Sequence, residues 1–224
     1  GIGLSFTEFK TVTNSKFVGL ENYISIFKTS DEFISSLIFT VAFSVVTVIL
    51  VNLLAFFLAL ILVKRFPLRN FYRTVFFMPN LIGGIVLGYI FQLIINGILL
   101  NYGYTITSNW SFGFWGLVAL SLWQMTGYMM VIYIAGLTSV PNELYEAAKV
   151  DGASGFRSLI SITLPSVMPS ITVCLFLTIT NSFKMFDQNL ALTAGAPSGQ
   201  TEMLALDIYN TFYGRGGGEG IGQA

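Results

Sequence analysis

The sequence predicts an all-α fold, a polytopic transmembrane helical bundle, and three observations support this class. Only 10% of the 224 residues are charged and the mean hydropathy is +0.74, whereas ordinary soluble domains carry about 25% charged residues. Three long stretches contain no charged residue, namely 33–63, 74–142 and 158–183. A membrane crossing needs about 20 largely apolar residues, so the first and third stretches each suit one helix and the second suits two.

The four predicted spans cover residues 34–63, 75–100, 113–137 and 166–183. Residues 101–109, between the second and third spans, are rich in turn-forming and polar side chains. Four aromatic residues flank this turn, as is typical of a bilayer interface: Tyr102, Tyr104, Trp110 and Trp115. The long uncharged stretch is therefore expected to form a hairpin of two membrane helices.

Basic residues predict the orientation of these spans. The loop after the first span contains Lys64, Arg65, Arg69 and Arg73. Lysine and arginine in short loops mark the cytoplasmic side of a membrane. Two crossings later the chain returns to that side, where it carries Lys149 and Arg157, so the two basic loops agree. Three segments are then expected outside the cell: residues 1–33, 101–112 and 184–224.

Composition excludes several classes of function. The formal net charge is zero and the sequence has no nucleic-acid motif, so nucleic acid is not an expected partner. The chain has no histidine, which removes the commonest general base and metal ligand. The single cysteine, Cys174, lies in an apolar run and cannot form an internal disulfide or a cysteine metal cluster. We expect neither a catalytic residue nor a metal site.

A polar helix–turn–helix pattern separates the last two spans. Pro141 is a helix-start signal, and Gly152 can adopt the left-handed conformation that ends a helix. Acids favour the first turn of a helix and cations the last, and the order of Glu143, Glu146 and Lys149 follows that rule. The pattern therefore predicts a short water-exposed helix that ends near Gly152.

A second short helix is expected over residues 154–162, after which Pro165 and Pro169 mark the return into the membrane. The small side chains of Ala147 and Ala148 would let another surface approach the first helix closely. From spacing alone, an ordinary loop with a short interfacial helix is an equally good interpretation.

The motif itself carries a resemblance. Residues 143–153 read Glu-Leu-Tyr-Glu-Ala-Ala-Lys-Val-Asp-Gly-Ala, and residues 162–165 read Ile-Thr-Leu-Pro. This resembles the signature loop of the membrane permeases of bacterial ATP-binding-cassette (ABC) importers. The fuller form is similar to the carbohydrate-uptake branch, most of all to the larger maltose permease and to the glycerol-phosphate and multiple-sugar permeases.

Other segments extend the resemblance over nearly the whole chain. Residues 17–23 resemble the outer segment after the first span of the family, and residues 71–79 contain its Arg-x-x-x-Phe-x-Pro pattern. Residues 192–197 resemble an outer Thr-Gly-Gly-Pro loop, from which Ala194 and Ala196 depart. Leu159 stands where the family often has phenylalanine, and it is expected to pack similarly.

The resemblance implies a type I ABC importer permease in which residues of about 139–165 form a cytoplasmic coupling loop. The residues implied to dock on an ATPase are Glu143, Glu146, Ala147, Ala148, Asp151 and Gly152. Glu146 would pair with a cation of the ATPase, the two alanines would permit close approach, and Gly152 would set the angle of the turn. ATP binding and hydrolysis in the ATPase would then rock the permease between outward- and inward-facing states.

The implied partners are a cytoplasmic ABC ATPase dimer, a second permease subunit that forms a heterodimer with this chain, and an extracytoplasmic solute-binding protein. The expected location is the lipid bilayer of the bacterial cytoplasmic (inner) membrane. This chain has no Gly-x-x-x-x-Gly-Lys-Ser/Thr phosphate loop. ATP and magnesium are therefore expected on the partner ATPase, with no cofactor bound by this chain and no enzyme activity of its own.

Polar side chains inside the spans mark candidate contacts for the transported solute, which the resemblance implies to be a sugar or a sugar-like molecule. Such groups are costly in lipid and usually face a cavity or another helix. Helical spacing places two sets on shared faces: Ser121, Gln124 and Tyr128, and Thr178, Asn181 and Ser182. Hydrogen bonding between helices is an equal alternative for each residue, and it explains Asn52, Gln92 and Asn96 better.

Two other classes of protein fit the sequence less well. An ion-coupled secondary transporter is the main alternative, but such carriers usually place charged residues or histidine within their spans, and these spans carry none. A membrane-embedded enzyme would need a nucleophile or paired carboxylates in a pocket. The carboxylates of Glu143, Glu146 and Asp151 cluster on an exposed helix instead.

Two segments follow from these assignments: an outer-face interfacial segment, 1–33, and a transmembrane permease domain, 34–224. Relative to the family, a first span before Gly1 and a last span after Ala224 are expected to be absent. The glycine-rich residues 214–224 are interpreted as a broken-off connection to a further span, with a flexible tail as the alternative.

Overall fold

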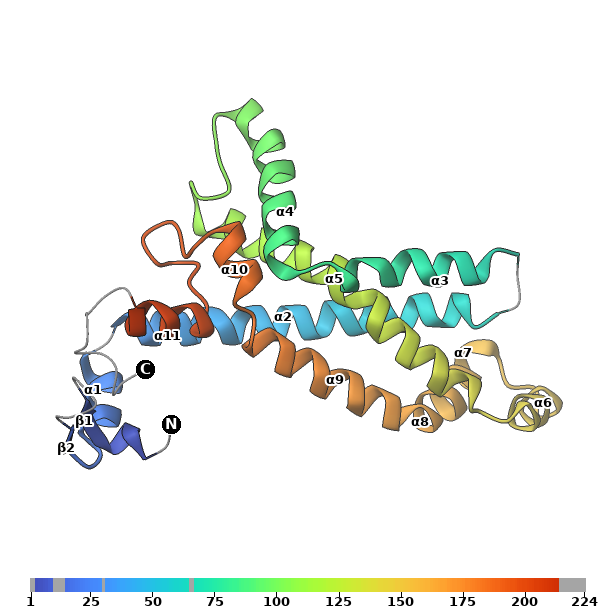
Figure 1. Cartoon of the computed structure of the whole chain (residues 1–224). Coiled ribbons are helices and arrows are strands. Elements are labelled where there is room, and N and C mark those ends of the chain that lie inside the picture. Colours follow the sequence, from blue (N-terminus) through green and yellow to red (C-terminus); the bar gives the residue numbers. More distant parts are fainter. Residues whose placement is uncertain (1–2, 10–14, 30, 65–66, 214–224) are drawn as a thin grey trace. The chain divides into compact units, whose positions relative to one another are not determined.

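The structure, a computed structural model, describes residues 3–9, 15–29, 31–64 and 67–213, and most of them are helical (Figure 1). The all-α prediction is confirmed except for one antiparallel pair of three-residue strands, β1 (Thr7–Phe9) and β2 (Ser15–Phe17), in the register Thr7 to Phe17. A helix, α1 (Glu21–Thr29), follows the pair. The interpretation of residues 214–224 lies outside the described residues.

Three described helices are long and apolar enough to cross a membrane, at 31–62, 84–102 and 110–138. They contain α2 (Asp31–Leu62), α4 (Gly84–Leu99) with the 3-10 turn η3 (Leu100–Tyr102), and α5 (Trp110–Thr138). A bent pair, in which residues 155–166 meet α9 (Met168–Phe183) at 68°, makes a fourth when the pair is counted as one span. Prolines at 165 and 169 flank this bend, and proline is a common cause of sharp helix kinks.

The predicted second span, 75–100, is wrong in its first part. A separate helix, α3 (Arg69–Phe77), runs into the 3-10 turn η2 (Met78–Leu81), and α4 begins only at Gly84. Ile82 is extended, with φ −87° and ψ 133°. Pro79 has no N–H to continue the helix, and two glycines follow at 83 and 84. The sequence stays apolar through this break, but the helix is interrupted.

The chain divides into two compact units, one of residues 1–43, 84–117 and 183–224 and the other of residues 44–83 and 118–182. In the second unit, α3 lies beside the C-terminal half of α2 (Figure 1), and the Arg73 Nη2 donates to the Leu62 carbonyl at 2.8 Å. The core of this unit joins α2, α5 and α9 through buried residues such as Val51, Ala55, Met129, Tyr133 and Cys174.

In the other unit, α10 (Asp187–Leu192) packs on α4 (Figure 1). A Cβ placed on Gly88 would lie 2.5 Å from the Cβ of Ala191, so this approach needs glycine. The Gln92 Nε2 donates to the Leu192 carbonyl at 2.9 Å. Asn189, which is fully buried, donates to the Thr201 carbonyl at 2.8 Å and thereby organises the loop that leads to α11 (Leu204–Tyr213).

Candidate functional site

The predicted polar helix exists as α6 (Asn142–Val150), and its ends have the expected chemistry. Pro141 precedes it in an extended conformation, with φ −61° and ψ 136°. Glu143 lies in the first turn and Lys149 in the last, as the helix dipole favours. The helix is only nine residues long, so its position must come largely from the contacts at its ends.

Gly152 ends α6 in the left-handed conformation, with φ +72°. The Gly152 N–H donates to the Lys149 carbonyl at 3.1 Å, and the Ala153 N–H donates to the Ala148 carbonyl at 2.9 Å. These two bonds form a Schellman motif, which satisfies the last carbonyls of the helix. A Cβ on Gly152 would have open space around it, so the need for glycine here comes from the backbone angle alone.

After the turn, the chain stays helical up to the last span. Ser154 caps α7 (Gly155–Ser158), because its Oγ accepts from the Arg157 N–H at 3.3 Å. A π-helical turn, η4 (Leu159–Thr163), and α8 (Leu164–Ser166) follow. The Tyr145 and Thr163 hydroxyls lie 3.1 Å apart, which ties α6 to the π turn. The hairpin is therefore an ordered element that its own internal hydrogen bonds hold together.

The predicted docking residues differ in exposure. Five are exposed on the hairpin: Glu143, Glu146, Ala147, Asp151 and Gly152. Ala148 is buried, with 7% of its surface accessible, and both alanines line a groove of about 380 Å³ on the hairpin together with Leu144 and Ile162. Of the two alanines, only Ala147 is thus available to another surface.

Exposed apolar side chains on the same hairpin were not predicted from the sequence. Leu144, Val150 and Phe156 are 44%, 88% and 73% exposed. Large apolar groups on a polar, water-facing element mark an interaction surface when they lie together. The sequence does show these apolar residues inside a charged stretch, which could have indicated an interaction surface. Their spacing alone does not indicate that they face outward.

The first set of candidate pathway residues lies on α5, opposite the helix break. Ser121 is fully buried, and the Gln124 Nε2 donates to the Ile82 carbonyl at 3.3 Å. The ring of Tyr128 lies 6.4 Å from that of Phe77. Gln124 therefore contacts the segment of irregular backbone between α3 and α4, where carbonyl groups are freed from helical bonding, and Tyr128 contacts the end of α3 beside it.

The second set lies on α9. The Thr178 Oγ1 donates to the Cys174 carbonyl at 2.6 Å and accepts from the Asn52 Nδ2 at 3.2 Å. The Ser182 Oγ donates to the Thr178 carbonyl at 2.8 Å, whereas Asn181 is exposed. These bonds satisfy Thr178 and Ser182 inside the bundle in this conformation, and a contact with solute stays a prediction for all six residues.

Asn52 and Gln92 join helices as predicted, whereas Asn96 bonds a loop. Asn52 also accepts from the Tyr133 hydroxyl at 2.8 Å, which joins α2 to α5. Asn96 accepts from the Ile106 N–H at 2.8 Å. Together with the Gln92 bond to α10, the Asn52 contacts confirm the predicted hydrogen bonding between helices, whereas Asn96 holds the loop between α4 and α5 instead.

Gly127 is a further residue that the sequence reasoning missed. A Cβ at this position of α5 would overlap the Phe76 carbonyl group. The end of α3 therefore packs directly on the α5 backbone, one position before Tyr128. A glycine in the interior of a predicted span was the available signal, since glycine there costs stability unless another backbone approaches closely.

Comparisons with known proteins place these features in a family. Residues 52–218 match the family described as "Binding-protein-dependent transport system inner membrane component". The chain is 43% identical over 223 residues to a "Probable starch degradation products transport system permease protein AmyD" of Thermoanaerobacterium thermosulfurigenes, covering 95% of this chain and 75% of that protein. It is 34% identical to a "Trehalose/maltose transport system permease protein MalF" of Thermococcus litoralis, with the same coverage.

A solved structure shares the fold. A chain of a bacterial ABC transporter involved in the import of the acidic polysaccharide alginate matches with a TM-score of 0.77 at 20% identity. The match covers 95% of this chain and 77% of that one.

Proposed function

Because this chain belongs to the family of binding-protein-dependent transport system inner membrane components, we propose that it is the permease subunit of an ATP-driven importer for sugars or sugar-like solutes. The observation that carries the proposal is the Schellman-capped polar hairpin at 142–166, placed between two apolar helices. The names of the relatives, which concern starch products and trehalose or maltose, support the solute class. They lend no support to an ion-coupled carrier.

The hairpin is the element that docks on a cytoplasmic ATPase dimer. Glu146 offers a carboxylate to a cation of that subunit, and Ala147 lets the ATPase surface approach the α6 backbone. Leu144, Val150 and Phe156 add apolar area around these two residues. Removal of one partner from a desolvated charge pair typically costs about 2–5 kcal/mol, so Glu146 is expected to matter more than its exposed neighbours.

Force from the ATPase would reach the membrane through the hairpin's internal bonds. The contact between Tyr145 and Thr163 links α6 to the segment that continues into α9. A displacement of α6 would therefore be passed to α9, which carries Thr178 and Ser182. ATP and magnesium belong to the ATPase in this scheme, and the permease contributes binding surfaces and motion without chemistry of its own.

A second permease chain is supported by the break between α3 and α4. Irregular backbone at membrane depth is tolerated only where protein buries it or where it lines a water-filled cavity. Met78 and Leu81 are 56% and 72% exposed in the isolated chain. A sister subunit facing this break would cover part of it and leave the rest to line the solute pathway.

Neutral sugars suit the polar side chains predicted to line the pathway on α5 and α9. Hydroxyl and amide groups on Ser121, Gln124 and Asn181 can exchange hydrogen bonds with sugar hydroxyls, and the ring of Tyr128 can stack on the apolar face of a sugar. None of these side chains carries a charge, which agrees with an uncharged solute. A solute-binding protein on the outer face would deliver the sugar to this pathway.

Co-purification of the full-length permease from its own membranes in mild detergent tests the proposal. We expect an ABC ATPase and a second permease to be recovered with the native chain. Gly152→Val and Glu146→Gln should reduce recovery of the ATPase about tenfold or more, because each removes a feature of the docking turn. Gly152→Asn is the matched variant that keeps the left-handed conformation accessible, and it should retain the ATPase.

A Glu21→Gln variant, which removes an acid outside the hairpin, controls for net charge and should behave as the native chain. Recovery of a lone permease without partners, or equal ATPase recovery from all four variants, would overturn the proposed docking element.

A further inference from the structure

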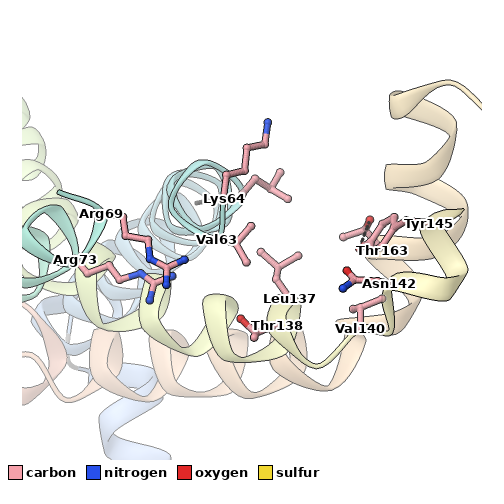
Figure 2. A pocket seen from close by; sticks show the side chains of 11 residues that line it. Val63, Lys64, Arg69, Arg73, Leu137, Thr138, Val140, Asn142, Tyr145 and Thr163 are labelled. Carbon is pink, nitrogen blue, oxygen red and sulfur yellow. Dashed lines mark hydrogen bonds between the residues drawn. The ribbon is translucent and has the colours of Figure 1, made fainter. Parts of the chain in front are cut away.

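A pocket of about 570 Å³ lies beside the docking hairpin, within the unit formed by residues 44–83 and 118–182. Figure 2 shows Arg69 and Arg73 on one side of it and Asn142, Tyr145 and Thr163 on the other. Its walls therefore come from the end of α2, from α3, from the end of α5 and from the hairpin itself. The volume is large enough for a small polar group rather than a single water molecule.

The charge of the pocket has one sign. Three cations line it, Lys64, Arg69 and Arg73, and the described residues of the lining include no carboxylate. Figure 2 shows the two guanidinium groups near each other, whereas the Lys64 side chain extends away from them. Like charges that face one cavity repel each other unless an anion lies between them. The pocket is thus electrostatically prepared for a negative ligand.

Arg73 supplies a second, independent observation. Its Nη2 is engaged by the Leu62 carbonyl at 2.8 Å, at the C-terminal end of α2. Its Nε, by contrast, is buried and has no hydrogen-bond partner among the described residues. A buried donor of a charged group that lacks a partner is costly, and an acceptor placed in the pocket would remove that cost.

The opposite wall offers neutral hydrogen-bonding groups. Thr138, Asn142, Tyr145 and Thr163 line it. The Thr138 hydroxyl donates to the Ile134 carbonyl at 2.6 Å, and the Tyr145 and Thr163 hydroxyls bond each other. The amide of Asn142 is therefore the neutral donor that this wall offers to a ligand oxygen. Arginine forks match the tetrahedral oxygens of phosphate in a bidentate manner and bind them more strongly than neutral donors do. The combination of two guanidinium groups with the Asn142 amide favours a phosphate group over a spherical anion.

We infer that this pocket binds a phosphate group carrying net negative charge, with Arg69 and Arg73 as its principal ligands. Two sources share this chemistry: the head group of an anionic lipid and a soluble phosphate. The pocket lies where α2, a predicted span, ends on the side predicted to be cytoplasmic. Basic pockets between helices on that face are known to suit lipid head groups. The bound phosphate would contact both α3 and the hairpin and so hold them together.

Native mass spectrometry of the full-length permease in its complete transporter, after removal of endogenous lipid, tests the inference. The probes are phosphatidylglycerol, phosphatidylcholine and inorganic phosphate. We expect the intact complex to retain phosphatidylglycerol in preference to zwitterionic phosphatidylcholine. Arg69→Gln should weaken retention about fivefold, since one cation near the membrane surface contributes about that factor, and the double variant with Arg73→Gln should weaken it further.

Matched variants keep the outcome interpretable. Lys184→Gln removes a cation that does not line this pocket and should leave phosphatidylglycerol binding unchanged. Arg69 makes no hydrogen bond to the α2 terminus, so its variant should fold even if loss of the Arg73 contact destabilises the helix end. Displacement of bound phosphatidylglycerol by inorganic phosphate at millimolar concentration, dependent on Arg69, would identify a soluble phosphate as the source.

Equal retention of both lipids by the native complex, without any phosphate binding that depends on Arg69, would overturn the inference. The readout is ligand binding rather than ATPase recovery. A negative result for phosphate binding therefore does not affect the proposed docking on the ATPase. A negative result in co-purification likewise does not affect the test of the pocket.

Discussion

The Tyr133 hydroxyl donates to the Oδ1 of Asn52 at 2.8 Å, so a single buried amide on α2 is held by α5. The same Asn52 donates through Nδ2 to the Thr178 hydroxyl on α9 at 3.2 Å. One side chain thereby connects three membrane helices. Because lipid offers no competing partners, these bonds help to determine which faces of the helices meet.

Tyr133→Phe is expected to destabilise the fold by about 0.5–1.5 kcal/mol, because it leaves the Asn52 oxygen without its donor and hydrogen bonds inside membranes contribute about that much. Unfolding of the purified permease in detergent, followed by tryptophan fluorescence, measures the change. Tyr89→Phe is the matched control, since Tyr89 is 56% exposed on α4, and it should have little effect. A Tyr133 variant as stable as this control would contradict the prediction.

Gly127→Ala is expected to disrupt the packing of α3 on α5, because its Cβ would overlap the backbone carbonyl of Phe76. Overpacking against a backbone costs about 1–3 kcal/mol or more, since no side-chain rotation relieves it. The yield of folded protein and its melting temperature report the effect. Gly97→Ala on α4 has open space around the new methyl group, and it should be neutral or stabilising.

Ala194→Gly is expected to stabilise the loop that follows α10 by about 0.5–1 kcal/mol. Ala194 has φ +48°, a left-handed angle that strains a residue with a Cβ and that glycine adopts freely. The gain is reduced by the greater freedom of glycine in the unfolded chain. Ala119→Gly, inside α5, should instead destabilise by up to about 1 kcal/mol. Opposite signs for the two Ala→Gly changes in thermal melts would support this reasoning.

Ala147→Leu is expected to impair ATPase binding, whereas Ala148→Leu is expected to destabilise the hairpin. Ala147 is exposed, so its variant should fold normally and lose the ATPase partner in co-purification. Ala148 is 7% exposed in the groove of the hairpin, so its variant should destabilise the hairpin by about 1–3 kcal/mol through overpacking. Limited proteolysis of the hairpin in the permease without its ATPase distinguishes the two, because only the Ala148 variant should be cleaved faster.

Much of the fold could be predicted from the sequence, because it depends on local or summed properties. Long uncharged stretches indicated the membrane helices, and the start at Pro141 and the left-handed end at Gly152 follow from backbone preferences of single residues. The prediction of one span over 75–100 was wrong because it relied on hydropathy alone. Hydropathy adds up over a window and does not register that Pro79 and the following glycines interrupt the helix.

The types of residue in the candidate site could be predicted from the sequence, whereas their burial and their contacts could not. Sequence alone indicated a docking helix with acids and paired alanines, and it marked polar residues on two helix faces. It did not distinguish Ala147 from Ala148, because neighbours in a helix differ by only about 100° in direction and the packing of the hairpin decides which one is buried. The sequence also did not indicate that Arg69, Arg73 and Tyr145 line one pocket.

Class, number of membrane helices and the polar hairpin were thus set by composition, charge position and backbone preference, which act within a few residues of one another. The partners of Asn52, the approach of Gly127 to Phe76 and the shared pocket of Arg73 and Tyr145 were decided only by tertiary packing. These contacts join residues that lie up to 126 positions apart. Each depends on how whole helices rotate and cross, and no local sequence pattern determines that.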